Sequence, residues 1–328
     1  MKSTTAQNPI ISSDDINRLV KLQYGLREAK CRLYRKTLNS IYLIENTSLK
    51  YVFKLYNVGN TILGELKAEI ELLQVLDSKG VRVAASIRDR HGEHIQLITR
   101  STESYYGVLF TFARGKTYYN LNDEQVVIFA TELARMHIIT EGLQLNNEKK
   151  EYNLDTLLKS PLEKILTSFN NNIEDFTWLQ QITALVGNKL IQLLRYQMSY
   201  GYCHFDLLPI NFHFDEQGNI TIFDFELAGR GYLINDLVSF YSHYFLLIMF
   251  NQGTKEEADR ALFLLVKYYT KVKPITAIEL EAFPYFGFAF WIFHLSHEHS
   301  MYDLSLGPNY IKQRLTIIKT WADWYLKF

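Results

Sequence analysis

Cysteine is scarce in this chain, which has two cysteines among its 328 residues. Cys31 and Cys203 lie far apart and show neither metal-site nor redox spacing. Small secreted domains need several disulfides because their hydrophobic cores are small. A chain with so few cysteines, and long enough to bury a large core, is interpreted most simply as a reduced, cytoplasmic protein.

Net charge and long apolar runs are absent as well. Lys plus Arg and Asp plus Glu both number 35, so the formal net charge is zero. This balance argues against a nucleic-acid partner and against a polybasic membrane anchor. The longest apolar runs, Phe245–Phe250 and Phe286–Phe293, are much shorter than the roughly 20 residues of a membrane span. We therefore expect both to form buried helix, and the polar opening residues do not predict a secretory signal.

The remaining composition is that of a globular protein, with 48% hydrophobic and 21% charged residues. Residues 14–26 and 62–78 have the apolar spacing of amphipathic helices, and most of the chain beyond Asn122 is predicted to be helical, including Asp123–Ile139 and Leu179–Tyr200. The predicted strands of the first part are Cys31–Thr37, Ser40–Glu45, Lys50–Tyr56, Ile87–Asp89, His94–Thr99 and Gly107–Phe112, with a hairpin turn at Arg90–Glu93. The fold class is therefore α+β, with a small strand-rich part at residues 1–112 and a larger helical part at residues 113–328.

One short hairpin is embedded in the helical part. A polar loop that contains His204–Asn211 precedes the predicted strands Phe212–Phe214 and Ile220–Phe223, and Asp224 follows the second strand. Because the two strands are adjacent, we expect Asp206, Asn211 and Asp224 to lie at one end of the hairpin.

These three side chains are the types that phosphoryl transfer requires. One carboxylate orients an attacking hydroxyl and takes its proton, and a second carboxylate with an amide oxygen holds Mg²⁺ against the phosphates. Each residue taken singly is a common turn or strand-end residue. Their combined spacing predicts a catalytic role for Asp206 and metal ligation by Asn211 and Asp224.

The same residues resemble the pattern of the aminoglycoside phosphotransferase and choline kinase family, which is distantly related to the protein kinases. That pattern is H-x-D-x4-N, a hairpin, and then D-F/W-E/D. Within the family, the runs VAASIRDRHGEHI and YYGVLFTFARG are most similar to the homoserine kinase-like and stress-response kinase branch. The resemblance implies a protein-kinase-like, two-lobed fold that binds ATP and Mg²⁺ as cofactors.

The resemblance also assigns residues outside the hairpin. Lys54 matches the strand lysine that contacts the ATP phosphates, and Glu69 matches the helix glutamate that pairs with that lysine. Lys54 has apolar neighbours, and a buried lysine needs a carboxylate partner; Glu65 is the alternative to Glu69. Phe110 and Phe112 lie where the family holds adenine between the lobes.

Further residues match family positions that surround the loop containing Asp206. His137 ends a segment that resembles a family helix, and Asp236 looks like the aspartate that braces the loop. His204 matches a histidine that packs beneath the loop, so we expect a structural role for it. The chain departs from the family at Phe205, where Gly or Asn is usual, and at Ile210, where Gly is common.

Three functions remain open from the sequence: a small-molecule hydroxyl kinase, a Ser/Thr protein kinase, and an inactive nucleotide-binding scaffold. The intact Lys, Asp, Asn and Asp set argues against the scaffold. Only eleven residues separate Asp224 from Asp236, which leaves no room for a long activation segment. We therefore expect a small polar acceptor with a free hydroxyl, while the identity of the acceptor and the oligomeric state stay open.

The acceptor is expected among the aromatic C-terminal helices. A cluster of titratable residues there permits three readings: a substrate-contacting patch, a solvated or core helix, or a metal site, which lacks the usual spacing. The cluster contains His294, His297, Glu298 and His299. The expected lining of the acceptor site is Tyr241, Tyr244, Trp291, His294 and Glu298.

Overall fold

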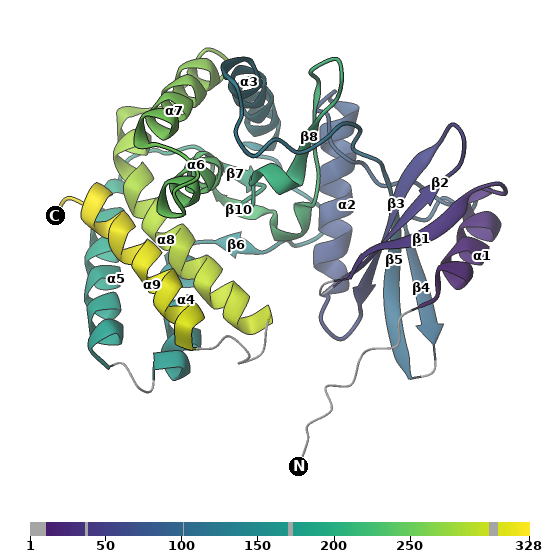
Figure 1. The fold of residues 1–328 in the computed structure, drawn as a ribbon, viewed down its shortest axis with the longest axis horizontal. Helices are drawn as coiled ribbons and strands as arrows, with labels where there is room; N and C mark the ends of the chain where they lie inside the picture. The colour runs from purple at the N-terminus through teal and green to yellow at the C-terminus, as the bar shows by residue number, and fades with distance from the viewer. Residues whose placement is uncertain (1–10, 37–38, 101, 170–172, 302–307) are drawn as a thin grey trace. The chain divides into compact units, whose positions relative to one another are not determined.

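A computed structural model of the chain describes residues 11–36, 39–100, 102–169, 173–301 and 308–328. The chain forms two compact units, each described here by itself (Figure 1). The first unit contains the residues up to Arg114 and the segment Leu145–Glu148, and the second contains Gly115–Gln144 and Lys149–Phe328. Both helices and strands are present, which confirms the predicted α+β class.

The first unit is built on a five-stranded antiparallel sheet with the strand order β1-β2-β3-β5-β4. Its elements are α1 (Ser13–Tyr24), β1 (Lys30–Lys36), β2 (Ser40–Glu45), β3 (Lys50–Asn57), α2 (Leu63–Ser78), β4 (Ile95–Arg100) and β5 (Glu103–Thr111). Ser12 caps α1 by accepting a hydrogen bond from the backbone N–H of Asp15 at 3.1 Å.

The alternation of side chains along β3 separates two chemical surfaces. Phe53 faces the core that Ile16 and Val20 of α1 share with the sheet. Because successive strand residues point to opposite faces, Lys54 and Tyr56 lie on the other face. The Tyr56 hydroxyl there donates to Glu69 of α2 at 3.4 Å.

The predicted pairing of Ile87–Asp89 with His94–Thr99 is wrong. The turn between them exists, because the Asp89 carboxylate accepts from the backbone N–H groups of His91 and Glu93, both at 2.8 Å. However, β4 pairs with β5 instead, and Ile87 only reaches Leu109 through one backbone hydrogen bond of 2.7 Å. The local turn was readable from sequence, whereas the choice of strand partner depended on β5, which begins earlier than predicted.

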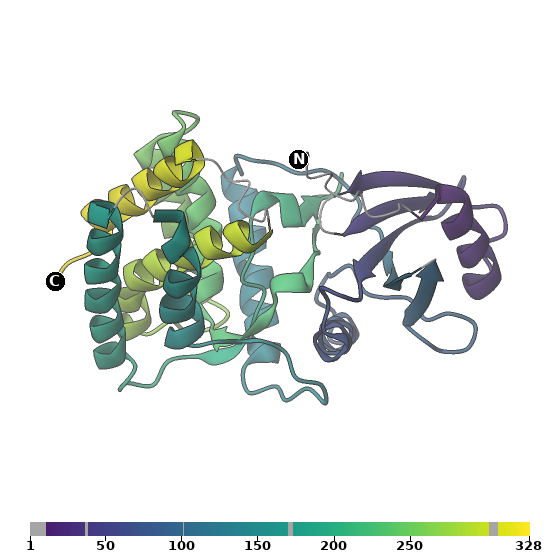
Figure 2. The same cartoon turned by 90° about the horizontal axis from the view of Figure 1, so that it is seen from below.

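The second unit is mainly helical. Its α-helices are α3 (Asp123–Thr140), α4 (Ser160–Ile165), α5 (Ile173–Leu193), α6 (Ile234–Met249), α7 (Lys255–Thr270), α8 (Ala277–Met301) and α9 (Pro308–Tyr325). Helix α8 packs against α4, α5, α6 and α9 (Figures 1 and 2). Among the helices that the structure describes, none has both the length and the apolarity needed to cross a membrane.

The two apolar runs behave largely as predicted. Phe286–Phe293 lies within α8, and Phe286 and Phe288 are fully buried. The other run ends α6, where Phe245 is fully buried but Phe250 lies beyond the helix and is exposed. Most aromatic side chains of this unit are therefore part of its hydrophobic core.

Short strands cross the helical unit. A three-stranded sheet has the order β6-β10-β7, and β8 pairs with β9 as the predicted hairpin. These strands are β6 (Glu151–Tyr152), β7 (Tyr200–Cys203), β8 (Phe212–Phe214), β9 (Ile220–Ile222) and β10 (Gly229–Tyr232). The ring of Phe129 on α3 lies 5.0 Å from that of Phe212 and 4.5 Å from that of Phe240, which ties the hairpin to α3 and α6.

Two boundaries were mispredicted here. The helix expected at Leu179–Tyr200 is α5, which ends at Leu193, and Tyr200 begins β7. This strand pairs with β10, which begins 29 residues further along the chain, so local sequence gave little sign of it. Gly201 permits the approach of α3, because an added Cβ would lie 2.5 Å from the Thr140 carbonyl oxygen.

Candidate active site

The loop after β7 brings Asp206 and Asn211 together. The Asn211 amide group donates to the backbone oxygen and to the Oδ2 atom of Asp206, each at 2.8 Å. The short helical turn Pro209–Asn211 makes this contact possible by folding the loop back on itself. Since both Asn211 bonds use its nitrogen, its amide oxygen is left as the atom suited to a metal ion.

Asp236, in the first turn of α6, holds this loop from beneath. Its two carboxylate oxygens accept from the backbone N–H groups of His204 at 2.8 Å and Phe205 at 2.7 Å. The Ser239 hydroxyl accepts from the Leu207 N–H at 2.7 Å. Asp236 and Ser239 are fully buried, so these bonds are shielded from water and fix the backbone on both sides of Asp206.

A second buried chain of hydrogen bonds supports Asp236. His137 Nε2 lies 2.9 Å from Asp236 Oδ2, and His137 Nδ1 lies 2.7 Å from the Tyr269 hydroxyl. Burial is the main cause that raises the pKa of Tyr269 far above its usual value, so the hydroxyl keeps its proton. Tyr269 can then donate to Nδ1 while Nε2–H donates to Asp236. Sequence reasoning singled out His137 and Asp236 but not Tyr269, which lies on α7.

His204 joins the loop to the segment that leads to Asp224. Its Nδ1 accepts from the Asp206 N–H at 3.3 Å, and its Nε2 lies 3.0 Å from the Phe223 carbonyl oxygen. The Phe223 N–H in turn donates to the Asn211 carbonyl oxygen at 2.9 Å. The ring of His204 is fully buried and engaged at both nitrogens, which fits the structural role expected for it.

The Asp224 backbone is in the left-handed region, with φ 67° and ψ 59°. A residue with a side chain adopts this conformation at a cost in energy, and such residues gather at functional sites. The negative charge of Asp224 also acts on the carboxylate of Asp206. Burial, opposed by His204 and reinforced by Asp224, raises the pKa of Asp206 to about 6. The structure thus brings the predicted residues Asp206, Asn211 and Asp224 to one end of the hairpin.

Phe205, the departure from the family pattern, also has a left-handed backbone, with φ 66°. This conformation explains why Gly or Asn suits the position. Here the phenyl ring is fully buried and stacks on Tyr152, with ring centroids 3.8 Å apart and planes 10° from parallel. Tyr152 therefore supports a strained residue next to Asp206, and no sequence signal pointed to it.

The predicted nucleotide-contacting residues lie in the first unit. Lys54 and Glu69 are both buried, at 7% and 3% exposure. The Lys54 ammonium lies 4.9 Å from the centre of the Tyr56 ring, whose hydroxyl donates to Glu69. Tyr56, which sequence reasoning missed, thus contacts both charged groups.

Phe110 and Phe112 differ in their surroundings. Phe110 is buried in β5 opposite Val52, whereas Phe112 lies just beyond the strand and is partly exposed. The Lys50 ammonium lies 4.2 Å from the centre of the Phe112 ring. Contact with adenine remains a prediction for both rings.

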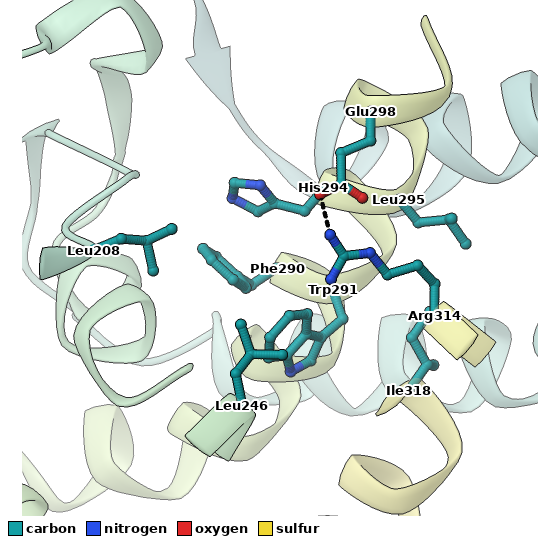
Figure 3. Close-up of a pocket in the computed structure, with 9 residues that line it drawn as sticks. All are labelled: Leu208, Leu246, Phe290, Trp291, His294, Leu295, Glu298, Arg314 and Ile318. Atoms are coloured by element: carbon teal, nitrogen blue, oxygen red, sulfur yellow. Dashed lines mark hydrogen bonds and ion pairs between the residues drawn. The ribbon is translucent and has the colours of Figure 1, made fainter. Parts of the chain in front are cut away.

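A cavity of about 80 Å³ adjoins the loop His204–Asn211 on the side of α8 and α9 (Figure 3). Its walls are mostly apolar, with His294, Glu298 and Arg314 as the titratable groups. Leu208 of the loop lines it from the opposite side. The complete lining is Leu208, Leu246, Phe290, Trp291, His294, Leu295, Glu298, Arg314 and Ile318.

The residues expected to line the acceptor site are divided between different places, and their role in acceptor binding remains a prediction. Trp291, His294 and Glu298 line the cavity, but Tyr241 and Tyr244 do not. Tyr241 is a core residue whose hydroxyl lies 2.7 Å from that of Tyr325, and Tyr244 lines a separate cavity beside α3 and α7. Within the described ranges, no group of three or more His, Cys, Asp or Glu side chains is placed to share a metal ion, so the metal reading of the α8 cluster gains no support.

Comparisons with known proteins give the family and the fold. Residues 31–265 match the model of the phosphotransferase enzyme family. Amicoumacin kinase of Bacillus subtilis is 26% identical over 223 residues, which cover 66% of this chain and 63% of that protein.

Two solved structures show the same fold. Amicoumacin kinase hAmiN, in complex with AMP-PNP, Ca2+ and Ami, has a TM-score of 0.72 at 18% identity, and the match covers 95% of this chain and 94% of the other. The microcompartment-associated aminopropanol kinase has a TM-score of 0.73 at 17% identity, with 93% and 94% covered. The predicted kinase-like α+β fold is confirmed.

Proposed function

The chain belongs to the phosphotransferase enzyme family, and we propose that it moves the γ-phosphate of ATP, with Mg²⁺, to a hydroxyl group of a small polar molecule. The observation that carries the proposal is the contact between Asp206 and Asn211 beside Asp224. It supplies a base and two metal ligands within one rigid loop and hairpin, which is the set that phosphoryl transfer needs.

Asp206 is suited to act on the acceptor hydroxyl. Its Oδ2 is held by the Asn211 amide, and its backbone is fixed by its neighbours' bonds to Asp236 and Ser239. With its pKa raised to about 6, the carboxylate is ionised near neutral pH yet basic enough to accept a proton. Asp206 would orient the hydroxyl towards the γ-phosphorus and take its proton as the new O–P bond forms.

The residues present fit a magnesium ion. Mg²⁺ keeps several waters and is commonly bound by one or two protein ligands together with substrate phosphates. The Asn211 amide oxygen and the Asp224 carboxylate provide two oxygen ligands of this kind, and the repulsion between Asp206 and Asp224 favours a cation. When bound, Mg²⁺ neutralises charge on the phosphates.

Lys54 would hold the phosphates of ATP, and Glu69 would steady the lysine. Both are buried side chains on elements of the first unit, where an unpaired charge would be costly. Phe110 and Phe112 would contact adenine. These assignments rest on the family resemblance and on the burial of Lys54 and Glu69.

A small acceptor is favoured over a protein side chain. The cavity beside the loop His204–Asn211 is mostly apolar with a few polar groups, and concave sites of this type suit small ligands. A protein substrate needs an open groove for an extended segment. Two similar proteins, amicoumacin kinase and aminopropanol kinase, are named for small-molecule acceptors.

A label-transfer assay tests the proposal. The protein is incubated with γ-labelled ATP, Mg²⁺, a panel of hydroxyl-bearing metabolites and generic protein substrates. We expect label on one or a few metabolites, loss of transfer in Asp206→Asn, and no loss in Glu216→Gln, which changes an exposed carboxylate in the hairpin turn. Robust labelling of proteins with no labelled metabolite would overturn the proposal.

A further inference from the structure

The strand β1 lies at one edge of the five-stranded sheet of the first unit (Figure 1). It carries four exposed cations, which are Lys30, Arg32, Arg35 and Lys36. Charged side chains on an edge strand prevent its pairing with another chain. That role requires charge but no particular face of the sheet, so the face on which each cation lies carries separate information.

A β-bulge determines the face on which Arg35 lies. Leu33 pairs with Tyr42, so regular antiparallel pairing would place Arg35 opposite Ser40. Instead the register shifts after Leu33, and Arg35 pairs with Ile41. Successive strand residues point to opposite faces, and directly opposite residues share a face. The extra residue of the bulge therefore moves Arg35 to the other face of the sheet, as bulges beside functional sites do.

The face that Arg35 reaches is the face of Lys54. Ile41 pairs with Lys54 on β3, so Arg35, Ile41 and Lys54 form one row across three strands. Neighbouring strands are about 4.8 Å apart, which places the backbones of Arg35 and Lys54 about 10 Å from each other. The next cation, Lys36, pairs with Ser40 and lies on the face that packs against α1.

The guanidinium of Arg35 is exposed and keeps its donors. Among the residues that the structure describes, none forms a hydrogen bond or an ion pair with it. Two other cations of this face, Arg32 and Lys50, pair with Glu45 at 3.3 and 3.8 Å. A guanidinium that is not neutralised by a carboxylate is well suited to phosphate oxygens.

The expected adenine contact lies on the same face. Phe110 pairs with Val52, which precedes Lys54 by two residues on β3. Two residues of a strand span about 7 Å. Adenine beside Phe110 would therefore leave the phosphate chain at the row that contains both Lys54 and Arg35.

We propose that Arg35 binds the phosphate chain of the nucleotide from the edge of the sheet, while Lys54 binds it from β3. This inference rests on the proposed function, which places ATP on this face. Arg35 supplies positive charge and N–H donors and takes no part in a covalent step. The two long side chains approach the phosphates from opposite ends of one row.

Calorimetry with Mg²⁺ and either ATP or adenosine tests the proposal. Arg35→Gln should weaken ATP binding about tenfold or more, as loss of a charge-assisted hydrogen bond implies, and should leave adenosine binding unchanged. Lys36→Gln is the matched control, because it removes the neighbouring cation from the other face; it should change ATP binding less than about twofold. Unchanged ATP binding in Arg35→Gln, an equal loss for adenosine, or an equal loss in Lys36→Gln would overturn the proposal.

A charge series at the same position strengthens the test. Arg35→Lys keeps the charge but not the planar fork of donors, and Arg35→Glu reverses the charge. We expect ATP affinity to fall in the order wild type, Arg35→Lys, Arg35→Gln and Arg35→Glu, and the differences to shrink at high salt. The series also covers the case in which one variant fails to fold. An order that does not follow the charge contradicts the assignment.

Lys54→Ala and label transfer separate this inference from the proposed function. ATP binding that is weakened by Lys54→Ala but not by Arg35→Gln would leave the proposed function intact and overturn the role of Arg35. ATP binding that depends on Arg35, without transfer to any acceptor, would support that role and count against the proposed reaction. A wild-type protein that does not bind ATP would overturn both.

Discussion

Phe205 allows the cost of backbone strain to be separated from the gain of ring burial. Its left-handed backbone favours Gly, yet its ring is fully buried against Tyr152. We compare Phe205→Gly, which removes the ring and relieves the strain, with Phe205→Ala, which removes the ring and keeps the strain. The two variants lose nearly the same packing and differ mainly in the backbone.

The magnitudes decide which effect is larger. Removing a buried phenyl ring costs about 3–5 kcal/mol, whereas the left-handed conformation costs a residue with a side chain about 1–2 kcal/mol. Gly also loses about 0.5–1 kcal/mol more than Ala through its greater freedom in the unfolded chain. We therefore expect both variants to be destabilised, with Phe205→Ala the less stable by up to about 1.5 kcal/mol.

Chemical denaturation followed by tryptophan fluorescence measures this difference. All tryptophans lie in the second unit, as does Phe205, so the signal reports on the relevant unit. They are Trp178, Trp291, Trp321 and Trp324. A Phe205→Gly variant as stable as the wild type, or less stable than Phe205→Ala, would refute the reasoning.

Three further predictions concern the ligands and the pH. Lys54→Ala should weaken ATP binding about tenfold or more by calorimetry, whereas Lys67→Ala, on the exposed side of α2, should not; an effect on folding alone would contradict the assignment. Asp224→Ala should remove the Mg²⁺ dependence of ATP binding, and an unchanged Mg²⁺ titration would place the metal elsewhere. Because the pKa of Asp206 is raised in the folded chain, its charge costs stability above pH 6. Asp206→Asn should therefore raise the free energy of unfolding at about pH 8 without metal, and the gain should fade towards about pH 4; a gain that is independent of pH would contradict this.

The residues that sequence identified best are those whose contacts are local. Asp206, Asn211 and Asp224 follow one another within a loop and a hairpin, so their spacing alone implied that they would meet. The apolar neighbours of Lys54 along β3 likewise indicated that this lysine would be buried, and it is. Their catalytic and binding roles remain predictions.

The residues that sequence missed are brought in by distant elements. Tyr269 reaches His137 from α7, Tyr152 reaches Phe205 from β6, and Arg314 reaches Glu298 from α9. Each is an ordinary tyrosine or arginine in its own segment, and only tertiary packing gives it a partner. The wrong pairing of Ile87–Asp89 has the same cause, because strand partners depend on the whole sheet.

The most direct test of the central claim is the turnover of Asp206→Asn, measured beside its affinity for ATP and Mg²⁺. We predict that turnover falls about 10²–10⁴-fold, as removal of an acid–base group does, while nucleotide affinity and folding are kept. Near wild-type turnover in this variant would show that Asp206 is not the base and would contradict the account.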